Sequence, residues 1–176
     1  TPCGTLFPYT TLFRSPATRI MPLRTLGRDG AGTDFDIAVA LRYAAGLPNA
    51  TGRLPNRPAD IVNLSLGGPA ASRTLTEAVA AAHAAGVIMV AAAGNDGSTE
   101  HNYPAAYPEV IAVTAVGSDG QLTDYANVGT EADPWIDIAA PGGNMLRDLD
   151  GDGFKDGILS TLGDDSGFGA QLDYIY

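Results

Sequence analysis

Cysteine and positive charge are both scarce in this sequence of 176 residues. Its single cysteine is Cys3, so no disulfide can form within the chain. Ten lysine and arginine residues stand against twenty aspartate and glutamate residues, and the formal net charge of −10 argues against nucleic acid and anionic membrane surfaces as partners. No apolar run approaches the roughly 20 residues of a membrane-spanning helix, so we expect no membrane partner either.

The remaining composition is that of a globular domain. Apolar residues make up 45% of the chain and charged residues 17%, and the length is sufficient for one domain with a real core. The segment Thr5–Ser15, however, resembles residue for residue the translation of a widely used sequencing adapter. We therefore expect residues 1–15 to be an adapter-derived artefact and residues 16–176 to carry the fold.

Strand and helix patterns alternate along the chain. An apolar run over 61–68 ends in glycines, an alanine-rich helix follows from about Thr74 to Ala85, and a second apolar run begins after Gly86. Such a strand–helix–strand unit implies a right-handed crossover and parallel strands. Further strands are predicted over 110–116, 135–140 and 158–162, and a helix from Thr33 to about Ala45. The sequence thus indicates an α/β fold with a mostly parallel sheet.

The predicted strand that begins after Gly86 ends in residues that could take part in a reaction. Its apolar residues predict a strand buried on both faces, and it finishes in Ala92-Ala93-Gly94-Asn95. Ligands of open α/β sheets bind at the carboxyl ends of the strands. There, the amide of Asn95 could donate to an oxygen that becomes negative during a reaction. A polar turn after a core strand is the alternative interpretation.

Small residues end three of the predicted strands: Ser65-Leu66-Gly67-Gly68, Ala92-Ala93-Gly94-Asn95 and Ala140-Pro141-Gly142. Together with the stretch from Tyr103 to Val113, and in this order, they resemble the subtilisin-like serine peptidases, or subtilases. The resemblance runs from about Arg19 to the C-terminus. It implies a three-layer αβα fold with helices on both faces of a mostly parallel sheet, here incomplete.

The resemblance also implies roles for particular residues. Asn95 would be the oxyanion-hole side chain, and Ser65-Leu66-Gly67 would pair with an extended substrate as an added strand. That strand and Ala92-Ala93-Gly94 would form the two walls of the pocket for the residue before the scissile bond. The implied protein is a secreted, monomeric serine endopeptidase that acts on proteins or peptides through an acyl-enzyme.

The catalytic triad of the family is missing from the sequence. The motifs Asp-(Thr/Ser)-Gly, His-Gly-Thr-His and Gly-Thr-Ser-Met-Ala do not occur, and His83 and His101 lie outside any such motif. We expect the first two motifs before Pro16 and the third after Tyr176, so that residues 16–176 are the central part of a catalytic domain that is inactive alone. The alternative is a non-catalytic calcium-binding or peptide-binding domain that kept the groove and lost the triad. A dinucleotide-binding domain is disfavoured because no G-x-G-x-x-G follows a predicted strand.

A second chemical signal is an acidic loop that starts at Asp148. Carboxylates at positions 1, 3, 5 and 9, with Gly153 at position 6 for a sharp turn, are typical of loops that bind Ca²⁺. The predicted ligands are the side chains of Asp148, Asp150, Asp152 and Asp156 and the carbonyl of Phe154. Position 12 is Leu159 rather than the glutamate of an EF-hand, and a solvated acidic turn is the alternative. Some subtilases hold a further cation with carbonyls in the region of Ala105 to Val110.

Overall fold

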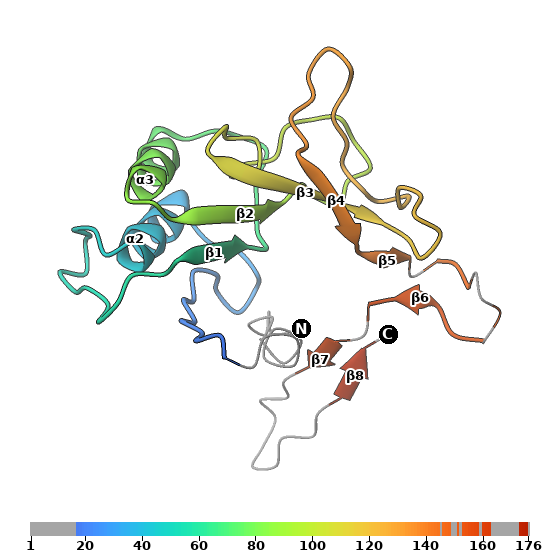
Figure 1. Ribbon diagram of the computed structural model, residues 1–176, viewed down its shortest axis with the longest axis horizontal. Helices are drawn as coiled ribbons and strands as arrows, with labels where there is room; N and C mark the ends of the chain where they lie inside the picture. Colours follow the sequence, from blue (N-terminus) through green and yellow to red (C-terminus); the bar gives the residue numbers. More distant parts are fainter. Residues whose placement is uncertain are drawn as a thin grey trace.

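A computed structural model describes residues 17–176 except 145, 149, 150, 152, 159, 163–172 and 176. The expectation for residues 1–15 therefore lies outside the described residues. The main elements, shown in Figure 1, are α2 (Asp34–Ala44), β1 (Ile61–Leu64), α3 (Arg73–Ala84), β2 (Ile88–Ala92), β3 (Val110–Val116) and β4 (Ile138–Pro141).

The four strands β1 to β4 form one sheet in sequence order, and every neighbouring pair is parallel. The register pairs Ile61 with Ile88, and Val90 with Ile111. This confirms the predicted parallel sheet. The predicted strand over 110–116 has the bounds of β3, whereas β4 begins only at Ile138 and extends to Pro141.

Both helices begin with a side-chain cap. Thr33 Oγ1 accepts a hydrogen bond from the backbone N–H of Asp36 at 3.1 Å and donates to the Asp36 carboxylate at 2.7 Å. Ser72 Oγ accepts from the N–H of Leu75 at 3.3 Å. Each cap satisfies an N–H group that has no partner within the helix, so these polar residues determine where the helices start.

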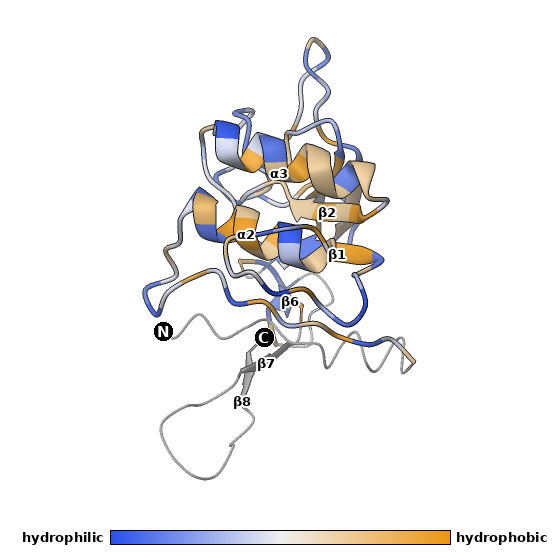
Figure 2. Ribbon diagram, turned by 90° about the vertical axis from the view of Figure 1, so that its left-hand side faces the viewer, coloured by the Kyte–Doolittle hydropathy of each residue, from blue (hydrophilic) through white to orange (hydrophobic). Residues whose placement is uncertain are grey.

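Helices α2 and α3 lie side by side and pack on one face of the sheet, with the strands behind them in Figure 2. The side chains between the helices and the sheet are almost completely buried: Leu75 and Met89 are 1% exposed and Val79 is fully buried. The small side chains of Ala82, Ala91 and Ala112 let the helices approach the strands closely. This layer is the hydrophobic core of the described residues.

The opposite face of the sheet carries a row of isoleucines that remain exposed. Ile61 is 62% exposed, Ile88 and Ile138 are 52% exposed, and Ile111 is 37% exposed. The prediction that the strand before Asn95 is buried on both faces is therefore wrong for Ile88. The reason is that the helices of the described residues pack against one face only, so the sheet and one helical layer of the three-layer fold are seen.

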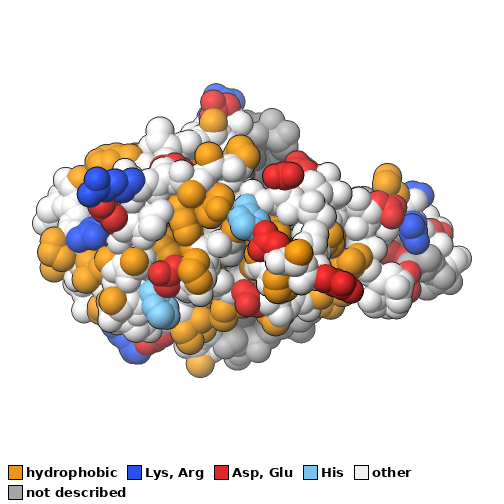
Figure 3. All heavy atoms as spheres, turned by 90° about the horizontal axis from the view of Figure 1, so that it is seen from above, with side chains coloured by type: hydrophobic (Ala, Val, Ile, Leu, Met, Phe, Trp, Pro, Cys, Tyr) orange, Lys and Arg blue, Asp and Glu red, His pale blue; other side chains and the backbone are white. Residues whose placement is uncertain are grey.

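Beyond β4 the chain forms short antiparallel pairs, drawn at the lower right of Figure 1. β5 (Gly143–Asn144) pairs with β6 (Asp156–Gly157), and β7 (Ser160–Leu162) pairs with β8 (Asp173–Ile175). Figure 3 shows acidic side chains spread across the middle of one face of the molecule and basic ones toward its edges. Among the described residues, no helix has the length and apolar character needed to cross a membrane.

Candidate active site

A cavity of about 470 Å³ opens at the carboxyl ends of the four parallel strands. It lies on the sheet face without helices, because Asn63, Val90 and Val113 line it from that face. Residues from all three predicted strand ends surround it: Ser65, Ala92, Ala93, Gly94, Asn95, Pro141 and Gly142. The structure thus brings together segments that are far apart in the sequence. Leu66 packs partly buried against the core instead of lining this cavity.

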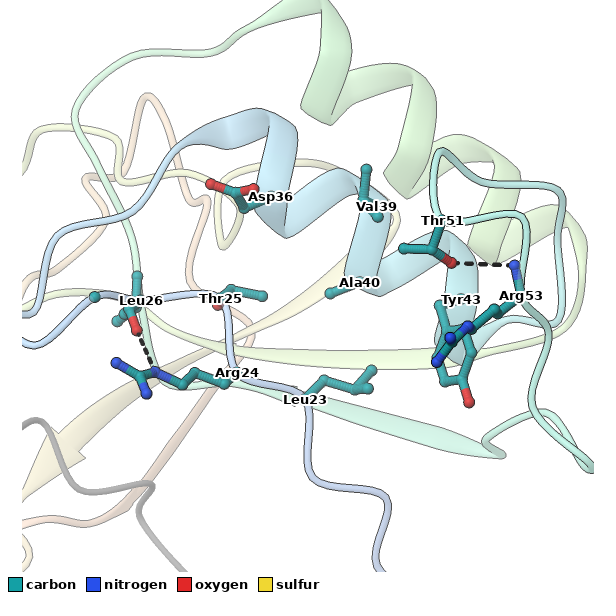
Figure 4. Close-up of a pocket in the computed structure, with 11 residues that line it drawn as sticks. Leu23, Arg24, Thr25, Leu26, Asp36, Val39, Ala40, Tyr43, Thr51 and Arg53 are labelled. Atoms are coloured by element: carbon teal, nitrogen blue, oxygen red, sulfur yellow. Dashed lines mark hydrogen bonds between the residues drawn. The ribbon is translucent and has the colours of Figure 1, made fainter. Parts of the chain in front are cut away.

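A larger hollow of about 970 Å³ lies between residues 23–27 and α2 (Figure 4). Its polar groups are engaged locally. Arg24 Nε donates to the carbonyl of Leu26 at 3.1 Å, and the N–H of Arg53 donates to Thr51 Oγ1 at 3.1 Å. Because no set of polar groups converges there and no strand end reaches it, we place the candidate site at the smaller cavity.

Asn95 stands on a short loop that leaves its side chain exposed. The preceding residue, Gly94, has a backbone φ of +113°, a conformation that residues with a Cβ rarely adopt. The bend turns the chain out of β2 just before Asn95. Asn95 therefore follows directly on the bend, is exposed, and is one of the residues that line the cavity.

The two predicted walls, Ser65–Gly67 and Ala92–Gly94, are separated by the side chain of Asn102. A Cβ on Gly67 would lie 2.5 Å from Asn102 Nδ2, and a Cβ on Gly94 would lie 3.1 Å from the same atom. Reciprocal backbone hydrogen bonds between Gly68 and Tyr103, at 2.8 and 2.9 Å, hold Asn102 in this place. Sequence reasoning missed Asn102, because it lies in a loop of polar residues with no motif of its own.

The third strand end is held by Tyr125. Its hydroxyl lies 3.0 Å from the carbonyl oxygen of Gly142 and 2.9 Å from that of Gly143, and donates toward both. A Cβ on Gly142 would lie 2.8 Å from this hydroxyl, so the glycine is needed for the close approach. Tyr125 therefore positions the Pro141-Gly142 turn at the side of the cavity.

The model of the subtilase family matches residues 14–170 of this chain. The chain belongs to the subtilase family. It is 41% identical over 137 residues to the thermophilic serine proteinase of Bacillus sp. (strain AK1), covering 78% of this chain and 31% of that protein. It is 45% identical over 123 residues to the halolysin of Haloferax mediterranei, covering 70% of this chain and 21% of the relative.

A solved protease structure from Pseudoalteromonas arctica is also similar. It shares 34% identity and superposes with a TM-score of 0.76, covering 90% of this chain and 44% of that one. These matches confirm the family and the fold class predicted from the strand-end motifs. This subtilase chain spans less than half the length of the relatives it matches. The roles of Asn95 and of the two walls stay predictions.

The two histidines of this subtilase chain lie apart from the cavity lining. His83 is exposed on α3. His101 Nε2 lies 2.8 Å from Asp133 Oδ2, its Nδ1 lies 3.3 Å from the hydroxyl of Tyr103, and its ring contacts Trp135 edge-on. These contacts join the loop of His101 to the segment that precedes β4.

The acidic loop is closed by the β5–β6 pair, which sequence reasoning missed because strands of two residues have no periodicity. Asp148 Oδ1 accepts from the N–H of Gly151 at 2.8 Å, and Oδ2 accepts from the N–H of Gly153 at 3.1 Å. Asp156 Oδ2 accepts from the hydroxyl of Ser118 at 3.2 Å. Asp150 and Asp152 lie outside the described residues, and the residues that are described contain no cluster of three metal-ligating side chains.

Proposed function

We propose that this chain is the central part of the catalytic domain of a secreted subtilisin-like endopeptidase, which hydrolyses peptide bonds in proteins through an acyl-enzyme. The observation that carries the proposal is the convergence of Ser65, the Ala92–Gly94 strand end and Asn95 around one cavity in a chain of this family. Secretion is supported by the relatives, one of which is named as an extracellular serine protease.

In the proposed reaction a serine hydroxyl attacks the carbonyl carbon of the peptide, a histidine takes its proton, and an aspartate orients that histidine. The motifs for these three groups do not occur within the 176 residues, so the proposal assigns them to other parts of the complete enzyme. The chain itself supplies the binding and electrostatic groups. The backbone of Ser65–Gly67 pairs with the extended substrate, and the Asn95 amide donates to the carbonyl oxygen as it becomes negative.

The exposed isoleucines support the view that more of the catalytic domain packs on the open face. Ile61 pairs with Ile88 between β1 and β2, and Ile111 of β3 pairs with Val90, which lies two residues from Ile88 on the same face of the sheet. Large continuous apolar patches on protein surfaces usually mark contact sites. The cavity opens on this same face, so chain packed there would stand next to Asn95.

The test is the substitution Asn95→Ala in the complete protease, assayed with a chromogenic peptide and a serine-directed inhibitor. The hydrogen bond from the Asn95 side chain strengthens as negative charge develops on the substrate oxygen. Loss of this hydrogen bond should therefore lower kcat and leave KM nearly unchanged. The expected magnitude, about 10²–10³-fold, was established on a subtilisin and is carried over from there.

The 176-residue chain alone should show no inhibitor-sensitive turnover. Full kcat in the Asn95→Ala enzyme would contradict the oxyanion role. Peptide binding without turnover by the complete protein would instead favour a non-catalytic binding domain.

We also propose that the loop from Asp148 to Asp156 binds a structural Ca²⁺. The fit rests on the donor set, because carboxylate oxygens suit a hard cation. In addition, the N–H groups of Gly151 and Gly153 donate hydrogen bonds to the Asp148 carboxylate, so the loop folds back toward Asp148. The side chains of Asp148, Asp150, Asp152 and Asp156 and the carbonyl of Phe154 would hold the ion, which would neutralise their mutual repulsion. Because the β5–β6 pair follows directly on the Pro141-Gly142 turn, an ordered loop would stiffen that side of the cavity.

Melting temperatures with and without EDTA test the calcium proposal. Since an ion that binds only the folded state stabilises it by mass action, EDTA should lower the Tm of the wild-type protein. The variant Asp150→Ala should lose this response, whereas Glu131→Ala, which removes an exposed acidic residue elsewhere, should keep it. An undiminished EDTA response in Asp150→Ala would overturn the assignment.

A further inference from the structure

A single buried side chain holds the loop that presents Asn95. Asn127 is 1% exposed and lies more than 30 residues further along the chain. Its side chain fills the space beneath the bend at Gly94, where a Cβ on the glycine would lie 2.5 Å from Asn127 Nδ2. Gly94 and Asn127 therefore form a matched pair, because the absence of one side chain makes room for the other.

The side-chain amide of Asn127 forms hydrogen bonds with backbone groups both before and after Asn95 in the chain. Its Nδ2 donates to the carbonyl of Ala93 at 3.1 Å, and its Oδ1 accepts from the N–H of Asp96 at 2.9 Å and from that of Ser98 at 3.3 Å. Its backbone N–H donates to the carbonyl of Gly94 at 3.3 Å. The residues before and after Asn95 are thus both fixed, while the Asn95 side chain itself remains exposed.

The position of Asn127 is in turn set by the sheet. The buried hydroxyl of Thr114, in β3, donates to the backbone carbonyl of Asn127 at 2.6 Å. β3 is paired directly with β2, the strand that leads into the loop. The chain of contacts therefore runs from β3 in the sheet through Asn127 to both ends of the Asn95 loop.

Only an amide of this length matches the groups around it. The carbonyl of Ala93 needs a donor, and the N–H groups of Asp96 and Ser98 need an acceptor. An aspartate would present acceptors alone, and a leucine of similar shape would leave the buried carbonyl of Ala93 and the part-buried N–H groups of Asp96 and Ser98 without this partner. The pattern of donors and acceptors therefore identifies a side chain selected for hydrogen bonding rather than for filling space.

We propose that Asn127 is a positioning residue for the oxyanion hole, which fixes the backbone on both sides of Asn95 so that its amide points at the developing negative charge. This inference rests on the proposed role of Asn95. Donors that are fixed in advance stabilise a transition state more than donors that must first be ordered. Asn127 touches neither the substrate nor the reacting atoms, and it acts only through the loop.

The test is a double-mutant cycle in the complete protease with Asn127→Ala, Asn95→Ala and the pair. The single variant Asn127→Ala should lower kcat by about 10- to 100-fold, the range expected when a group is displaced by roughly 1 Å, and leave KM nearly unchanged. In the Asn95→Ala background the same substitution should change kcat by only about two-fold, because the donor it positions is already gone.

A matched control separates positioning from loss of stability. Val79→Ala removes fully buried atoms from α3 in the core, away from the loop, and should lower Tm while leaving kcat unchanged at temperatures well below melting. Asn127→Ser, which keeps a small polar group, serves as the second variant if Asn127→Ala does not accumulate as folded protein. It should show the same dependence on Asn95.

The outcomes are distinct. Unchanged kcat in Asn127→Ala, with a large fall in Asn95→Ala, would overturn the role of Asn127 and leave the proposed function standing. Equal losses of kcat from Asn127→Ala in both backgrounds would likewise overturn it, since Asn127 would then act independently of Asn95. An Asn95→Ala enzyme with full kcat would overturn the proposed function and this inference together.

Discussion

The two faces of the β1–β4 sheet differ sharply although the same strands make them. On the face under α2 and α3, Met89 is 1% exposed, whereas its neighbour Ile88 on the other face is 52% exposed. Both are large apolar residues in one strand. What separates them is the alternation of side chains along a strand, which sends neighbours to opposite faces, and the presence of helices on one face only among the described residues.

The two faces also differ in how much they contribute to stability and in whether they carry the candidate site. Apolar burial contributes roughly 25 cal/mol per Å² removed from water, so the face under the helices carries most of the stabilisation. The open face contributes less but holds the cavity and Asn95 at its edge. The stable face supports the structure, and the open face presents the candidate site.

The largest expected effect comes from comparing neighbours on the two faces. In the 176-residue chain, Met89→Ala should lower the free energy of unfolding by about 2–5 kcal/mol, because it leaves a cavity under the helices. Ile88→Ala should cost about 1 kcal/mol or less, since that side chain is half exposed. Urea unfolding monitored by circular dichroism measures both values. Similar losses in the two variants would show that the open face is covered in solution.

A smaller effect is expected at the start of α2, the helix that helps to cover the buried face. Thr33→Ala removes the cap of the Asp36 N–H and should cost about 1 kcal/mol. Thr33→Ser keeps the hydroxyl and should cost much less. The same unfolding measurement applies. If alanine and serine destabilise equally, the hydrogen bond seen at Thr33 does not contribute to stability.

The smallest change in stability, with a clear change in surface, is expected from the open face itself. Replacing Ile61 and Ile88 together by threonine keeps the preference for strand and should alter the free energy of unfolding by less than about 1 kcal/mol. It should, however, reduce the fluorescence of a bound apolar dye such as ANS, because the continuous apolar row is broken.

The control for this measurement replaces Phe35 and Leu54, which are 57% and 58% exposed but lie outside the sheet. This double variant should leave dye fluorescence nearly unchanged. Equal losses of fluorescence in the two double variants would mean that the dye reports scattered apolar residues and not the open face.

Local signals predicted much of this fold. Thr33 with Asp36 marked the start of α2, and the run from Val110 to Val116 had the bounds of β3. The parallel sheet was predicted from the strand–helix–strand order, and the structure confirms it. The family was predicted from the small residues at three strand ends together with the stretch from Tyr103 to Val113, and the comparisons confirm it. The predicted candidate site was partly assembled in the same way, since Ser65, Ala92 and Asn95 do line one cavity.

Periodicity, helix caps and glycines act over a few residues, so the order of amino acids is enough to specify which segments become strands and helices. Which face of each strand is covered depends instead on packing between distant segments. The same is true of the positions of Asn102 between the two walls and of Asn127 beneath the bend at Gly94. Those contacts join residues that are far apart in the chain, as with Asn127 and Ala93. An isolated asparagine has no pattern that reveals its partner. Its role is set by the close approach that a glycine allows and by the donors and acceptors that the fold brings to it.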